Sequence, residues 1–147
     1  MHESAAAKKL LAATLPLMRT PPVNLGVICD CLKVEVYAMP CEAFGAAFSH
    51  CGGRRCLLVN SRLPQGRFRF SIAHELGHFL LRHRPLAYIG EKRSPAIEKE
   101  ADAFASELLL PEDFLRADAA RFTVPDLARR YKVSRQALEI RMKNLKF

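Results

Sequence analysis

The sequence lacks the run of roughly eighteen apolar residues that a membrane-spanning helix requires, so a membrane protein is not expected. Residues 10–18 are largely apolar, but Lys8 and Lys9 follow the acidic Glu3 and no convincing cleavage site comes after them. We therefore do not favour a secretory signal peptide.

A complete set of paired cysteines is also missing. Five cysteines cannot all pair within one chain, which argues against a disulfide framework and for reduced thiols in a cytoplasmic protein. Their spacings match no standard zinc-binding pattern, so we expect small core residues rather than metal ligands. The five are Cys29, Cys31, Cys41, Cys51 and Cys56.

Acidic residues are in the minority. The 147 residues include 23 Lys and Arg against 15 Asp and Glu, which gives a net charge of +8. Such a charge would attract an acidic partner, nucleic acid, or a protein bound to nucleic acid, although for charge alone a generally basic surface is the favoured explanation. The length and the ordinary apolar content suit one globular domain.

The most informative stretch is His74-Glu75-Leu76-Gly77-His78, an H-E-x-x-H motif. Residues four apart on a helix lie on one face, so His74 and His78 can direct two imidazoles at one point. Two imidazoles supply two corners of a tetrahedral zinc site, and Glu75 lies where it can accept a proton from the attacking water. A surface helix with two chance histidines is the competing explanation.

The flanking residues favour a helix over residues 64–83. Apolar residues recur at helical spacing from Ile72 to Leu80, Pro64 suits the first turn, and Pro85 stops the helix. Because the two histidines border this apolar stripe, we expect them to be partly buried.

A catalytic zinc site needs a third protein ligand, and a predicted helix over residues 94–111 supplies a candidate. Ser94 and Pro95 are typical of a helix start, and Pro111 of its end. Glu98 lies on the apolar face of this helix, where a carboxylate is rare unless it is paired or bound to metal.

The other acids of this helix are assigned by their direction. Asp102 lies one turn after Glu98, where it can hydrogen-bond the far nitrogen of a liganding histidine. Glu100 points about 200° away from Glu98, so Glu98 is the favoured ligand. We expect Glu100 and Glu107 to be solvated surface charges.

Two stretches resemble the ImmA/IrrE-type zinc metallopeptidases: RFSIAHELGHFLL from Arg69 to Leu81, and EKEADAFASELLLP from Glu98 to Pro111. They are similar to the family patterns R-F-[ST]-x-A-H-E-[LI]-G-H-x-x-L and E-x-E-A-[ND]-x-F-A-x-E-L-L-x-P. The resemblance implies a zinc ion and a compact domain with a small sheet beside the metal helices. It also implies cytosolic bacterial proteases that cut, or otherwise inactivate, helix-turn-helix repressors of mobile elements or stress genes. Members often carry His right after the leucine pair, where this chain has Arg82 before His83.

The remaining pattern predicts an α+β fold. Helices are expected at residues 4–18 and 24–32, and strands at 33–39, 43–50 and 55–60. The short links between the strands suggest a small antiparallel three-stranded sheet packed on a helical zincin-like core. We expect a single metallopeptidase-like domain with N-terminal helices and sheet at 1–63, metal-binding helices at 64–111, and a C-terminal helix-turn-helix-like segment at 112–147.

Residues 125–145 have the pattern of a helix-turn-helix pair. Ser134 is a good cap for the second helix, whereas Lys132 stands where a turn glycine is usual. The pair could read a DNA major groove. We favour a packing module that completes the protease core, because the family that the chain resembles carries such a segment in its catalytic domain. The basic residues expected to be exposed are Arg129, Arg130, Arg135, Arg141 and Lys143.

The loop at residues 84–93 could border the cleft. Tyr88 in this loop, or His83 directly before the loop, could donate a hydrogen bond to a developing oxyanion. A loop tyrosine is more often a packing residue. An extended peptide substrate could add to an open edge of the sheet.

These observations together predict a zinc-dependent endopeptidase with His74, His78 and Glu98 as ligands and Glu75 as general base. Manganese or iron would also suit a histidine–carboxylate set. The alternative is a regulatory protein that binds DNA or sequesters a repressor, with a structural or vestigial metal site. A hydrolase of small amides is a third interpretation, which would need a narrow, closed pocket.

Overall fold

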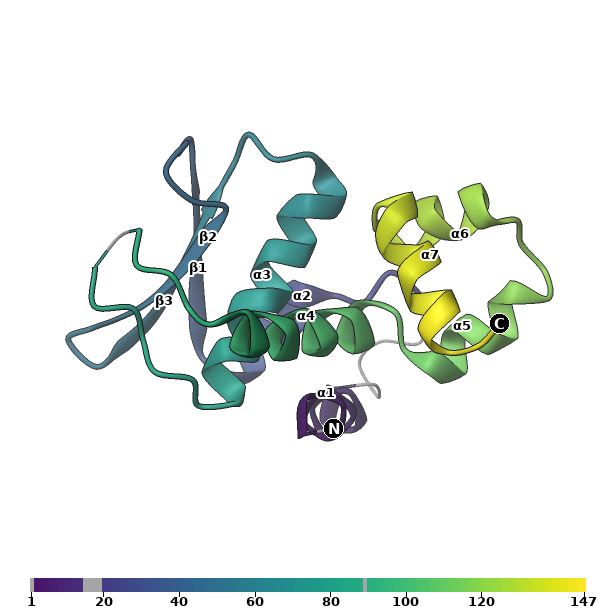
Figure 1. Cartoon of the computed structure of the whole chain (residues 1–147), viewed down its shortest axis with the longest axis horizontal. Helices are drawn as coiled ribbons and strands as arrows, with labels where there is room; N and C mark the ends of the chain where they lie inside the picture. Colours follow the sequence, from purple (N-terminus) through teal and green to yellow (C-terminus); the bar gives the residue numbers. More distant parts are fainter. Residues whose placement is uncertain (1, 15–19, 89) are drawn as a thin grey trace.

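The computed structural model describes residues 2–14, 20–88 and 90–147, and over these residues the chain has the predicted α+β fold (Figure 1). The helices are α1 (His2–Thr14), α2 (Leu25–Cys31), α3 (Gln65–Leu80), α4 (Pro95–Leu109), α5 (Glu112–Ala119), α6 (Val124–Tyr131) and α7 (Arg135–Asn144). The strands are β1 (Val34–Met39), β2 (Ala46–Cys51) and β3 (Arg54–Asn60).

The three strands form a mixed sheet in the order β1-β3-β2, so the predicted antiparallel sheet was wrong. β2 and β3 form an antiparallel hairpin around Gly52 and Gly53, which both have positive φ. β1 instead pairs parallel to β3. β3 carries the fully buried Leu57 and Val59, and burial of the most apolar strand accounts for its central position between two strands that are consecutive in the chain.

Two predicted helices are compared with the observed ones. Of the helix expected at 4–18, residues up to Thr14 lie in α1, and residues 15–18 lie outside the described residues. The helix expected at 64–83 ends at Leu80, before Arg82 takes a left-handed conformation with φ 58°. Across the described residues, no helix is both long and apolar enough to cross a membrane.

α4 is the central helix of the molecule. It packs against both α1 and α3, and it runs from the sheet towards the C-terminal helices (Figure 1). α3 and α4 approach closely at Gly77, where a Cβ atom would lie 3.0 Å from the ring of Phe104. The glycine of the H-E-x-x-H stretch thus leaves room for Phe104, and the two helices that carry the candidate ligands are held together by this contact.

The C-terminal segment folds as the predicted helix-turn-helix pair. Ser134 caps α7 by accepting a hydrogen bond from the N–H of Ala137, and Lys132 occupies the left-handed turn position with φ 53°. The start of α3 lies directly against this turn, because a Cβ at Gly66 would come 2.8 Å from the backbone nitrogen of Ser134. The pair is therefore packed on the metal-binding helix.

Two charges that were expected to be exposed are buried instead. Glu107 on α4 and Arg141 on α7 form an ion pair across the interface between the two helices, with relative exposures of 4% and 8%. Arg141 also donates a hydrogen bond of 3.1 Å to the carbonyl of Leu110. The sequence pattern could not reveal this pair, because its members are 34 residues apart.

Candidate metal centre

Three ligand-type side chains from two helices converge at one point. His74 Nε2 lies 3.0 Å from His78 Nε2, as their one-turn spacing on α3 predicts. Glu98 on α4 places Oε2 3.2 Å from His74 Nε2 and Oε1 3.0 Å from His78 Nε2. The described part of the chain holds no second cluster of this kind, and none that includes a cysteine.

Asp102 fixes the orientation of the His74 ring. Its Oδ1 lies 2.8 Å from His74 Nδ1, as expected from its place one turn after Glu98. An ionised carboxylate only accepts hydrogen bonds, so Nδ1 is the nitrogen that carries the proton. The Nε2 lone pair of a neutral His74 therefore points into the cluster.

His83 and Glu100 fix the His78 ring in the same way. His83 Nε2 lies 2.7 Å from Glu100 Oε2, so this nitrogen donates and the Nδ1 of a neutral His83 ring accepts. His78 Nδ1, 2.8 Å from His83 Nδ1, must then donate, which leaves the His78 Nε2 lone pair facing the cluster. The expectation that Glu100 is merely a solvated charge was wrong. Glu100 is the last group in a hydrogen-bonded chain that runs from His78 through His83.

Burial and charge set the basicity of the two rings. Burial lowers the pKa of His78 to about 3, so the ring is neutral and its lone pair is free at neutral pH. Burial also acts to lower the pKa of His74, but the hydrogen bond and charge of Asp102, with the charges of Glu75 and Glu98, raise it above its ordinary value. A proton and a metal therefore compete for His74 Nε2.

The spacing of these atoms fits a tetrahedral metal ion. Ligand distances of about 2.0 Å give ligand–ligand edges of about 3.3 Å in a tetrahedron, close to the 3.0–3.2 Å found here. Three acceptors at such distances repel one another unless a cation lies between them. Two imidazoles and one carboxylate are also the donor set of catalytic zinc sites that keep one position open.

Glu75 lies beside the cluster at the edge of the sheet. Its side chain is buried, with a relative residue exposure of 8%, and burial raises its pKa to about 7. Its carboxylate accepts a hydrogen bond from the backbone N–H of Phe48 on β2. A carboxyl group with this pKa can both accept and return a proton near neutral pH.

A cavity of about 290 Å³ opens next to His78 and His83. Arg93, in the loop before α4, lines it, and its positive charge acts to lower the pKa of both Glu75 and His78. No motif singles out this residue, which stands directly before the Ser94 cap. Tyr88 is 67% exposed and lines neither this cavity nor the larger one between α3, α4 and α7, and both ring nitrogens of His83 face other side chains.

The fold and the cluster together define a class, that of metallopeptidases built on an H-E-x-x-H helix. Residues 29–143 match the model of a peptidase family described as the IrrE N-terminal-like domain. The chain belongs to this ImmA/IrrE-type metallopeptidase family.

One curated relative is the radiation response metalloprotease IrrE of Deinococcus radiodurans. The two are 34% identical over 146 residues, which cover 91% of this chain and 42% of that protein. The chain thus spans less than half the length of this relative. A solved structure, a Mycobacterium tuberculosis transcriptional regulator, has the same fold with a TM-score of 0.60 and 19% identity, over 92% of this chain and 44% of that one.

The hydrogen-bonded chain from His78 through His83 to Glu100 leads to a prediction. Glu100→Ala should weaken zinc binding by about 10- to 100-fold, because His83 loses the acceptor that sets its tautomer and so no longer orients His78. Competition with a chromophoric zinc chelator measures the change. Lys99→Ala, at the adjacent exposed position, is the control and should bind zinc as the wild type does. Equal zinc affinities for the wild type, Glu100→Ala and Lys99→Ala would show that Glu100 does not contribute to zinc binding.

Proposed function

We propose that this chain is a zinc-dependent endopeptidase. The convergence of His74 Nε2, His78 Nε2 and the Glu98 carboxylate within 3.0–3.2 Å of one another carries the proposal. Zinc is the first choice because it favours a tetrahedral site of nitrogen and oxygen ligands, although manganese or iron would suit the same donors.

A divalent ion at this point would supply Lewis acidity, which acidifies water and polarises the scissile carbonyl. Glu75 accepts a proton from the attacking water and returns it to the leaving amide nitrogen. Asp102 and the His83–Glu100 pair hold the two imidazoles in the orientation that keeps both Nε2 lone pairs on the cluster.

The outer edge of β2 is the place we propose for the peptide. The N–H of Phe48 donates a hydrogen bond to Glu75 and not to β3. It therefore points to the side of β2 that no other described strand covers. An extended segment that pairs with this edge would pass directly beside Glu75. Alternate N–H groups along an antiparallel strand face the same side, so the N–H of His50, like that of Phe48, faces this open edge. Removing it, as in His50→Pro, should raise KM for a peptide, and an unchanged KM would count against this placement.

Arg93 is the group that we propose for stabilising the negative charge that develops on the carbonyl oxygen. It lines the cavity beside His78, and its Nε is buried with no hydrogen-bond partner among the described residues. Arg93→Met should lower kcat by about tenfold to a hundredfold, with KM and zinc content preserved. An unchanged kcat would remove Arg93 from this role and leave Tyr88 and His83 as the candidates.

We propose that the substrate is a cytoplasmic helix-turn-helix transcriptional repressor, as the resemblance of the two motifs implies. Purified chain should be mixed with the repressor encoded nearest to it, and the products identified by mass spectrometry. We expect one pair of fragments that disappears with a chelator and returns with zinc. An intact repressor after incubation with the zinc-loaded protein would overturn the proposal.

The alternative, a DNA-binding regulator, is less well supported by the charges of the helix-turn-helix pair. Each arginine of α6 and α7 has an acidic partner, which reduces the positive charge available to phosphates. The pairs are Arg129–Asp126, Arg130–Asp118, Arg135–Glu139 and Arg141–Glu107.

A further inference from the structure

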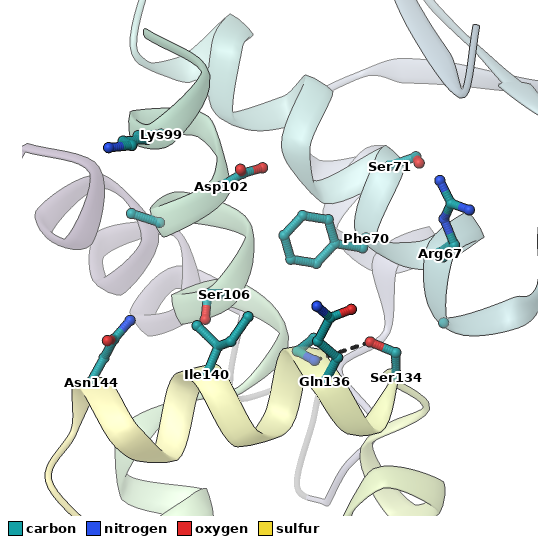
Figure 2. Close-up of a pocket in the computed structure, with 13 residues that line it drawn as sticks. Arg67, Phe70, Ser71, Lys99, Asp102, Ser106, Ser134, Gln136, Ile140 and Asn144 are labelled. Atoms are coloured by element: carbon teal, nitrogen blue, oxygen red, sulfur yellow. Dashed lines mark hydrogen bonds between the residues drawn. The ribbon is translucent and has the colours of Figure 1, made fainter. Parts of the chain in front are cut away.

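A second cavity, of about 700 Å³, lies between the metal-binding helices and the helix-turn-helix pair (Figure 2). One wall is a stripe on α7, formed at four-residue spacing by Gln136, Ile140 and Asn144. Phe70 of α3 and Ser106 of α4 lie on the other sides, and Figure 2 shows all of these side chains around the same space. The cavity is therefore bounded by three helices that are far apart in sequence.

The lining has an apolar centre and a basic rim. Phe70, Ala103 and Ile140 supply the apolar surface, and Ile140 is 52% exposed although it is a large aliphatic residue. Arg67 and Lys99 supply the positive charges, and neither has an ion-pair partner among the described residues. The lining contains one acid, Asp102, whose carboxylate is already engaged with His74.

We infer that this cavity docks an acidic, amphipathic segment of the protein substrate, at a distance in sequence from the bond that is cut. This inference rests on the proposed protease function. Apolar side chains of the segment would fill the space between Phe70 and Ile140, and its carboxylates would pair with Lys99 and Arg67. A cavity of this volume takes a few side chains from one helical or extended segment, in the way that a groove between helices receives the apolar face of another helix.

Duplex DNA is not the occupant that the geometry favours. In helix-turn-helix proteins the first residues of the second helix reach the base edges. Here Gln136 and Ile140 share their cavity with Phe70 and Lys99, so the metal-binding helices stand where a duplex would have to approach. The side chains that would read bases instead face a space too small for DNA.

The cavity lies close to the candidate metal centre, so docking there would help to bind the substrate near the reacting groups. Asp102 lines it and also contacts His74, so a segment held there keeps the rest of the substrate close to the metal centre. Tethering of this kind raises the local concentration of the scissile bond without altering the reacting groups. The contribution of the cavity should therefore fall on KM and not on kcat.

The test compares two substrates with three variants. Ile140→Glu and Lys99→Glu should each raise KM for the intact repressor by about tenfold. Neither variant should change kcat, zinc content or the cleavage of a short synthetic peptide that spans the cut site. Lys143→Glu is the matched control, because Lys143 lies on α7 but does not line the cavity, and it should behave as the wild type does.

Equal effects on repressor and peptide, or no effect on either, would overturn the docking inference. Fluorescence anisotropy of labelled repressor bound to the Glu75→Gln protein gives a readout that does not need cleavage. Weaker binding when Ile140→Glu or Lys99→Glu is added to the Glu75→Gln protein would support the docking site. This holds even if the wild type cuts no repressor, and in that case only the proposed protease activity fails. No binding, or displacement of the repressor by a DNA duplex that then occupies the same surface, would overturn it.

Discussion

Glu75→Gln will abolish peptide cleavage and leave metal binding intact. Glutamine has nearly the same shape as glutamate, but its amide cannot accept a proton from water. Loss of the general base should lower kcat by about 10²- to 10⁴-fold. The measurement is the single-turnover rate on a cleavable repressor or peptide, together with the zinc content of the purified variant.

Metal binding should survive this change because Glu75 is not among the atoms that converge on the cluster. The cluster consists of His74, His78 and Glu98, and the hydrogen bonds that orient the two rings come from Asp102 and His83. Cleavage at the wild-type rate by Glu75→Gln would show that another group serves as the base. A loss of zinc would instead show that Glu75 belongs to the ligand set.

Arg141→Ala should destabilise the fold by about 3–5 kcal/mol, because it leaves the Glu107 carboxylate buried without its partner. Arg141 joins α7 to the central helix α4 through this carboxylate and through the carbonyl of Leu110. Urea unfolding followed by circular dichroism measures the change. The control is Arg135→Ala, whose ion pair with Glu139 is exposed and should contribute less than about 1 kcal/mol.

A double replacement separates the two causes of this loss. Glu107→Leu combined with Arg141→Met removes both buried charges and keeps most of the side-chain volume. It should recover most of the stability that Arg141→Ala loses, because no unpaired charge is left in the interface. If the double variant is as unstable as Arg141→Ala, packing at this position matters more than charge.

Local rules were sufficient for much of the site. The four-residue spacing of His74 and His78 placed their rings together, since a helix has a fixed pitch. Glu98 was favoured over Glu100 because it lies on the apolar face of its helix, and its carboxylate does lie next to both Nε2 atoms. The caps Ser94 and Ser134 also form as predicted, because each depends only on the three residues that follow it.

Features that depend on contacts between distant segments could not be predicted. Glu100 looked like a solvated charge because the helical pattern shows where it points but not that His83 is there to meet it. The burial of Arg141 depends in the same way on Glu107 of another helix. The sheet order was missed because chain adjacency favours neighbouring strands only about two-thirds of the time. Arg93 lines the cavity beside His78 only because the loop before α4 returns to this place, which no local pattern shows.

Counting metal ions per chain tests the central claim most directly. The protein is purified without added zinc, then loaded with zinc and desalted. It should then contain one divalent ion per chain by inductively coupled plasma mass spectrometry. His78→Ala and Glu98→Ala should contain almost none, whereas Glu139→Ala, the same kind of change at an exposed site on α7, should keep it. A Glu98→Ala protein that retains one tightly bound ion would contradict the assignment of His74, His78 and Glu98 as the ligand set.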